Sequence, residues 1–166
     1  MNGKDSCYTQ IQSGIQPISF EKNLLDTIPF ELSEHNNIIV DAILNDKDTL
    51  KLMFHTAASE VSLTQKAVKR ISKTDFGKES EAMSWGGSGR TRSSENNQVT
   101  IGAMTYKDLR IWESQHSGPG TDGKFGMNFF DNKIVEINYE KSYLVIRSEL
   151  GKIDKSYVKE DLIFNQ

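Results

Sequence analysis

A single ionisable side chain stands where an apolar run ends in a loop of small residues. The run covers residues 52–54, and the loop after it reads His55-Thr56-Ala57-Ala58-Ser59. A neutral imidazole can act as a general base, and small residues at such a junction let the backbone pass close to another group. Burying an unpaired ionisable group costs free energy. His55 is therefore either a hydrogen-bonded core histidine in a tight turn or part of a functional loop.

The element that must position His55 is a predicted hairpin. Residues 37–44 and 49–54 are rich in β-branched and large apolar residues, and the turn between them contains Asn and Asp. Ile39, Ala42 and Leu44 cannot share one face under strict alternation. We therefore expect either a bulge or burial on both faces of the first strand.

The rest of the pattern is typical of an all-β protein with little helix. Further short strands are expected at residues 17–20, 28–32, 98–101, 104–106 and 109–112, and a second hairpin at 133–138 and 143–147. A helix is predicted for residues 62–71, with Ser62 or Thr64 as its N-cap, and one helical turn for residues 128–132.

The order of these elements resembles one lobe of a retropepsin-like aspartic peptidase. That family has a strand, a hairpin turn, a strand that ends in Asp-Thr/Ser-Gly-Ala-Ser, and later two apolar residues and a glycine before a short helix. Residues 38–59 follow the first part, and Asp122-Gly123-Lys124-Phe125-Gly126 follows the second. The resemblance covers roughly residues 28–146. It implies a partly open, retropepsin-like barrel with one longer and one short helix.

The chain departs from the family pattern in its chemistry. His55 stands in the position of the catalytic Asp, and Ala57 in that of the glycine. Lys124 replaces an apolar residue, whereas Thr56 keeps the residue that helps to lock the two catalytic loops together in the family. The family glycine allows a close approach of the backbone that a side chain resists. We therefore expect Ala57 to shift the loop or to strain it, at a cost of roughly 1 kcal/mol.

The resemblance places His55 and Thr56 at the catalytic position, with a binding groove and a flap around them. The implied groove and flap residues are Ala57, Ala58, Ser59, Trp85, Gly86, Gly87, Phe125 and Gly126. Residues 72–97 are polar and rich in turn residues. They are either a surface loop anchored by a tryptophan or a flap-like hairpin whose glycines allow it to move.

An aspartic peptidase needs two carboxylates that share a proton, one from each lobe or subunit. With His55 in place of one of them, we expect an aspartic-peptidase-like domain that is non-catalytic and has a structural or peptide-binding role. Two alternatives stay open. One is an active peptidase in which His55 pairs with a carboxylate from a second lobe or subunit, and the other is a plain structural β-domain.

Composition excludes several other classes. The net charge of −3, with no basic patch, argues against a nucleic-acid partner. One cysteine, Cys7, excludes an internal disulfide, and His35, His55 and His116 lack the spacing of metal ligands, so no metal or cofactor is expected. No apolar run reaches membrane-spanning length, and the first residues lack the apolar core of a signal peptide. Bacterial members of the family are often exported, so the resemblance implies a periplasmic or secreted location if a signal peptide was removed.

The chain is long enough for one domain. We expect an N-terminal segment at residues 1–27, a barrel lobe at 28–148 and a C-terminal tail or linker at 149–166. The apolar residues at 162–164 look like a strand cut short. The expected partners are therefore a second lobe of the same protein or a homodimer partner, together with a peptide ligand.

Overall fold

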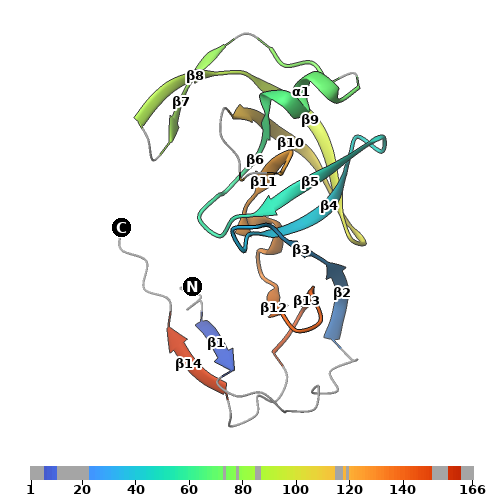
Figure 1. Ribbon diagram of the computed structural model, residues 1–166, viewed down its shortest axis with the longest axis vertical. Coiled ribbons are helices and arrows are strands. Elements are labelled where there is room, and N and C mark those ends of the chain that lie inside the picture. The colour runs from blue at the N-terminus through green and yellow to red at the C-terminus, as the bar shows by residue number, and fades with distance from the viewer. Residues whose placement is uncertain are drawn as a thin grey trace.

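The computed structural model describes residues 6–10, 23–72, 74–77, 79–84, 87–114, 118, 120–150 and 157–161. These residues form a mainly β structure, as predicted (Figure 1). The strands are β1 (Ser6–Gln10), β2 (Leu24–Pro29), β3 (Glu31–Leu32), β4 (Ile38–Leu44), β5 (Asp48–Phe54), β6 (Val61–Thr64), β7 (Ser80–Ser84), β8 (Gly87–Thr91), β9 (Ser93–Ile101), β10 (Met104–Ser114), β11 (Gly123–Phe125), β12 (Ile134–Asn138), β13 (Tyr143–Arg147) and β14 (Tyr157–Asp161). Helix α1 spans Gln65–Arg70, and the 3-10 helix η2 spans Met127–Phe130.

Seven strands form the main sheet in the order β3-β4-β5-β11-β6-β10-β9. Strand β4 also pairs with β9, with Ala42 opposite Ile101, so the sheet curls into a barrel around the apolar core. This confirms the predicted barrel. The core side chains come from alternate positions of each strand, as the period of two requires.

The first predicted hairpin is confirmed as β4 and β5. Its turn residues Asn45 and Asp46 have φ angles of 51° and 56°, which Asn and Asp adopt more readily than most residues. Ala42 and Leu44 point into the core, whereas Ile39 is buried on the opposite face. Burial on both faces therefore explains the sequence pattern, and no bulge interrupts the β4–β5 pairing.

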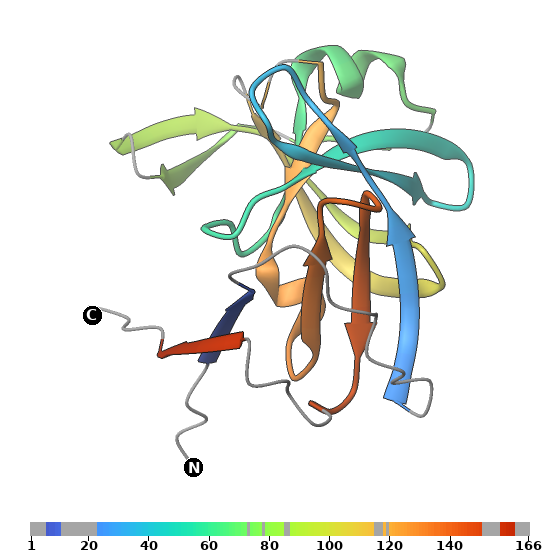
Figure 2. The same ribbon diagram turned by 60° about the horizontal axis from the view of Figure 1, so that its bottom comes forward.

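A second sheet, in the order β12-β13-β2, packs against the barrel (Figure 2). It contains the second predicted hairpin. The Asp26 carboxylate of β2 accepts a hydrogen bond of 2.7 Å from the Ala103 backbone N–H in the β9–β10 turn. Gly102 in that turn has a φ of 58°, and a side chain there would collide with Asp26. One carboxylate thus joins the two sheets.

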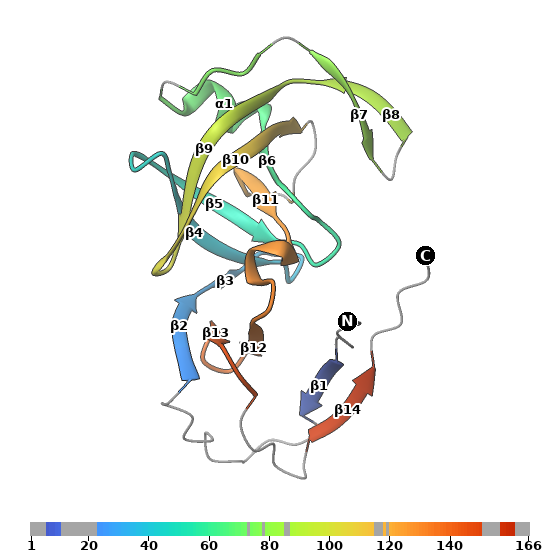
Figure 3. The same ribbon diagram turned by 180° about the vertical axis from the view of Figure 1, so that it is seen from behind.

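The two ends of the described chain pair with each other. Strand β1 is antiparallel to β14, with Cys7 opposite Glu160, in a two-stranded ribbon (Figure 3). The strand predicted at residues 17–20 lies outside the described residues. No helix in the described part of the chain is long and apolar enough to cross a membrane.

Several predicted elements have different bounds from those expected. Residues 61–64 form β6, because they pair with β10 and β11, and α1 begins only at Gln65. Thr64 caps α1, since its hydroxyl accepts from the Ala67 N–H at 3.1 Å, and Ser62 does not. The strands predicted at 104–106 and 109–112 form one continuous strand, β10. Within it, Asp108 has a φ of 55° at the point where the pairing of β10 with β9 shifts register.

Residues 80–84 and 87–91 are paired strands rather than a loop. Strands β7 and β8 are antiparallel, with Ala82 opposite Gly89. This favours the flap-like alternative over the surface loop. The predicted tip, Trp85 and Gly86, lies outside the described residues.

Candidate functional site

The loop after β5 is held against the end of β11 by main-chain hydrogen bonds. The His55 N–H donates to the Phe125 carbonyl at 3.0 Å, and the Met127 N–H donates to the Ala58 carbonyl at 3.3 Å. Within the loop, the Ala58 N–H donates to the His55 carbonyl at 3.0 Å. The parallel pairing of β5 and β11 therefore places the His55 loop beside the start of η2.

Two glycines make this close packing possible. A Cβ on Gly126 would overlap the backbone carbonyl of Ala58, and a Cβ on Gly123 would overlap the Ser62 carbonyl. Both glycines are buried. Only a residue without a side chain fits at either position while the backbone stays in place. The pattern Gly123-Lys124-Phe125-Gly126 thus has a steric cause.

His55 is partly exposed at the end of the strand, so it is not a core histidine. Its Nδ1 accepts a hydrogen bond of 3.2 Å from the Ala57 N–H. A backbone N–H can only donate, so Nδ1 carries no proton in this arrangement. The neutral imidazole therefore carries its proton on Nε2, and Nε2 is a hydrogen-bond donor.

A cluster of aromatic rings lies beneath the loop. Phe54 and Phe125 stack with their centroids 5.3 Å apart, and Phe129 and Phe130 meet the Phe125 ring edge to face. The Tyr106 hydroxyl donates to the Phe129 carbonyl at 2.5 Å. Burial, with a smaller contribution from the nearby Asp26 carboxylate, raises the pKa of Tyr106 to about 12. The floor of the site is thus a packed cluster of aromatic rings.

The face of the sheet that carries His55 holds a row of side chains across five strands. Each residue of this row is the register partner of the next, from β10 through β6, β11 and β5 to β4. We call Trp112, Ser62, Lys124, Met53 and Ile39 the outer row. Met53 and His55 are two residues apart, so their side chains leave the sheet on the same side. The outer row therefore passes beside the His55 loop at Met53.

Sequence reasoning did not group these five residues. Ser62 was expected in a helix, and the short alternation of residues 61–64 was too brief to decide between strand and helix. The alternation of residues 53–55, with Phe54 between Met53 and His55, was the one signal that pointed to a shared face.

The structure brings some of the predicted site residues together and separates others. Thr56, Ala57 and Ser59 are exposed in the loop and Ala58 is half-buried. Gly126 lies beside them, whereas Phe125 is fully buried below and supports the loop without reaching its surface. The backbone of Gly87 begins β8, and Trp85 and Gly86 fall outside the described residues. The β7–β8 hairpin, the β1–β14 ribbon and the His55 loop all lie on one side of the barrel (Figures 1 and 3).

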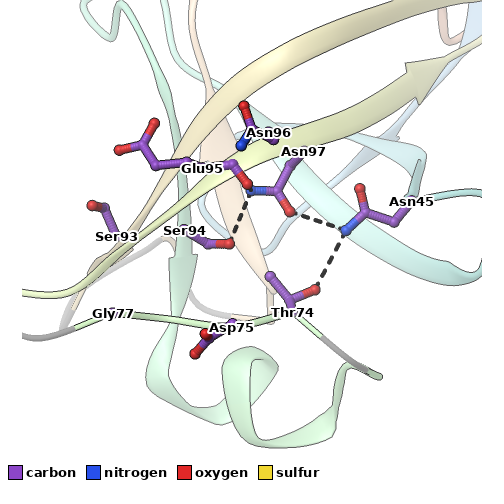
Figure 4. A pocket seen from close by; sticks show the side chains of 9 residues that line it. All are labelled: Asn45, Thr74, Asp75, Gly77, Ser93, Ser94, Glu95, Asn96 and Asn97. Carbon is purple, nitrogen blue, oxygen red and sulfur yellow. Dashed lines mark hydrogen bonds between the residues drawn. The ribbon is translucent and has the colours of Figure 1, made fainter.

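A polar hollow of about 460 Å³ lies elsewhere on the barrel, between residues 74–77 and the start of β9 (Figure 4). It contains none of the predicted site residues. The buried Asn97 side chain donates to Ser94 Oγ at 3.1 Å and accepts from the Asn45 amide at 3.0 Å. Because its polar groups are paired, this network explains the local structure of β9 without a ligand.

Metal ligands do not gather in the described part of the chain. No three His, Cys, Asp or Glu side chains there come close enough to hold an ion. His35 lies in an exposed turn, and His116 falls outside the described residues.

Known proteins match both the sequence and the fold. A family model described as aspartyl protease matches residues 40–129, more than half of the chain. No curated protein matches the sequence. Similar solved structures include a retropepsin-like aspartic protease from Rickettsia conorii, with 15% identity, 98% of this chain and 100% of that chain covered, and a TM-score of 0.51. The EIAV protease complexed with the inhibitor HBY-793 has 15% identity over 61% of this chain and 91% of that one, with a TM-score of 0.45.

At such low identity the structural likeness shows the fold alone, and the fold is retropepsin-like. The match to the family model extends from β4 to η2, across both the His55 loop and the Gly123–Gly126 pattern. The chain belongs to the aspartyl protease family.

Proposed function

We propose that the chain forms one half of a peptide-binding groove and does not cleave the peptides that it binds. The observation that carries this proposal is the hydrogen bond from the Ala57 N–H to Nδ1 of His55. Water activation in this family needs one ionised carboxylate and one protonated carboxyl group. His55 offers neither, and its other ring nitrogen, Nε2, is a donor that cannot take a proton from water in this tautomer.

Peptide binding is supported by what surrounds the loop. The β7–β8 hairpin and the His55 loop lie on the same side of the barrel (Figures 1 and 2). A strand-like peptide binds through main-chain hydrogen bonds, and its alternate side chains enter pockets. The outer row would line such pockets.

A partner would complete the groove. The β1–β14 ribbon has two strands with open edges, and an isolated ribbon of this size is marginally stable in water. Single-lobe retropepsin-like proteins typically form dimers. We therefore propose that the β1–β14 ribbon contacts a second copy or a second lobe, and that the lobe begins at β2 rather than at residue 28, because β2 pairs with β13.

The test is cleavage of a mixed peptide library, read by mass spectrometry between about pH 3 and about pH 8. The native chain is compared with His55→Ala, with the double variant His55→Asp/Ala57→Gly, and with His35→Ala as a control at an exposed histidine. We expect no cleavage by the native chain and cleavage by the double variant. Cleavage by the native chain that His55→Ala abolishes and His35→Ala preserves would overturn the proposal.

One observation favours a second candidate, an active peptidase in which a histidine and a carboxylate replace the usual pair of carboxyl groups. His55 is partly exposed, so its Nε2–H can reach a carboxylate supplied by a second lobe or subunit. Such a pair would have to transfer protons through the imidazole rather than between two carboxyl groups. The same library experiment decides between the two candidates.

A further inference from the structure

The outer row contains hydrogen-bond donors that have no partner among the described residues. Ser62 is 8% exposed, and its Oγ is buried without a hydrogen-bond partner. Val61 and Leu63 on either side belong to the core, so the Ser62 side chain points to the opposite face of the sheet. A buried hydroxyl that has no partner is uncommon and calls for an explanation.

Lys124 lies directly beside Ser62. The two residues are register partners on the antiparallel strands β6 and β11, so their Cβ atoms are about 5 Å apart on the same face. Lys124 is half-buried, and no ion pair involves it among the described residues. Ser62 and Lys124 are therefore two adjacent donors, one neutral and one cationic.

Asp122 and Glu60, each two residues along the chain from a member of this pair, already have partners. Asp122 binds the Arg70 guanidinium at 2.7 Å and the Lys51 N–H at 2.9 Å. Glu60 accepts the indole N–H of Trp112, the other neighbour of Ser62 in the outer row. No ion pair joins either carboxylate to Lys124 among the described residues, so a ligand can supply an acceptor for both donors.

We propose that Ser62 and Lys124 form a binding site for the carboxylate of an acidic side chain in the bound peptide, so that they determine its specificity. This inference rests on the proposed groove. A carboxylate accepts from both a hydroxyl and an ammonium group, and such charge-assisted hydrogen bonds are stronger than neutral ones. Met53 and Ile39, both buried at the far end of the outer row, would contact an adjacent apolar side chain.

The experiment measures which peptides the whole chain retains. A library of peptides of about ten residues, randomised in sequence, N-acetylated and C-amidated, is passed over the immobilised protein, and the bound fraction is sequenced by mass spectrometry. We expect Asp and Glu to be enriched at one position. Lys124→Met should lower the affinity of an enriched peptide roughly tenfold or more, and Ser62→Ala should lower it by a smaller factor. Lys66→Met, at an exposed lysine of α1, is the matched control and should change nothing.

The other outcomes would contradict the proposed specificity alone or the proposed groove as well. Bound peptides without an acidic preference, or an acidic preference that Lys124→Met leaves intact, would overturn this inference and leave the groove standing. Retention of no peptide would overturn the groove and the inference together. A parallel library with free C-termini separates the two sources of a carboxylate. Enrichment confined to that library would mean that the chain end, not an acidic side chain, is bound, which contradicts the proposal.

Discussion

The backbone carbonyl of Ala58 occupies the space in which a side chain on Gly126 would begin. Gly126→Ala must therefore push the His55 loop away from η2 and break the bond from the Met127 N–H to Ala58. We expect the free energy of unfolding to fall by roughly 2 to 4 kcal/mol, as for other backbone clashes in a packed site. Urea denaturation measures the change.

A second glycine provides the control for this prediction. Nothing lies within contact distance of a Cβ on Gly89, which is exposed in β8. Gly89→Ala should therefore change the free energy of unfolding by no more than about 0.5 kcal/mol. Equal effects at the two glycines would show that loss of glycine flexibility, rather than the contact with Ala58, is responsible.

Asp122 joins three elements through one carboxylate. It accepts from the Lys51 N–H in β5 and from Arg70 at the end of α1, while its own main chain pairs with β5 and β6. Asp122→Ala should lower the free energy of unfolding by roughly 2 kcal/mol, because it leaves the Lys51 N–H unpaired. Arg70 is half-exposed, so Arg70→Gln should cost less than about 1 kcal/mol. If Arg70→Gln costs as much as Asp122→Ala in urea denaturation, the ion pair carries the stability and the main-chain bond does not.

Tyr106 should make the stability fall at high pH. Its pKa is raised to about 12, chiefly by burial, while an unfolded tyrosine titrates near its usual value of 10. Between these two values the unfolded chain loses the proton first, so the free energy of unfolding decreases as the pH rises through this window. Tyr106→Phe lacks this titration. Its stability deficit, which comes from the lost bond to the Phe129 carbonyl, should therefore shrink from pH 9 to pH 11.

Urea denaturation at several pH values tests this, and Tyr139→Phe is the control because Tyr139 is 58% exposed. Ultraviolet absorbance of tyrosinate follows the ionisation directly. A deficit for Tyr106→Phe that stays constant across this range would contradict the prediction.

Local sequence signals were enough where neighbouring strands are also neighbours in the chain. The β4–β5 turn uses Asn45 and Asp46 at positive φ, and the strands on either side alternate or are buried on both faces. The hairpin of β12 and β13 likewise joins two paired strands that follow one another in the chain. The order of these elements and the glycine pattern were sufficient to predict the fold class.

Contacts between distant segments explain what the sequence did not reveal. Residues 61–64 become a strand because β10 and β11 supply hydrogen bonds on both sides. The local sequence pattern does not indicate this pairing. Asp108 lies between two strands predicted as separate, yet the β10 ladder continues past it through a register shift. The pairing of β1 with β14 joins opposite ends of the chain. For the same reason, Ser62 was not recognised as a neighbour of Lys124 before their strands were paired.

The hydroxyls of Ser62 and Thr64, two residues apart, should have opposite effects on stability. Thr64 Oγ1 caps α1 by accepting from the Ala67 N–H, so Thr64→Ala should lower the free energy of unfolding by about 1 kcal/mol, and Thr64→Ser should restore most of it. Ser62 Oγ is buried without a partner, so Ser62→Ala removes an unsatisfied polar group and should raise the free energy of unfolding by up to roughly 1 kcal/mol. Urea denaturation of the three variants measures both effects. A loss of stability in Ser62→Ala would mean that the hydroxyl is satisfied inside the folded chain, and it would remove the reason to expect a ligand there.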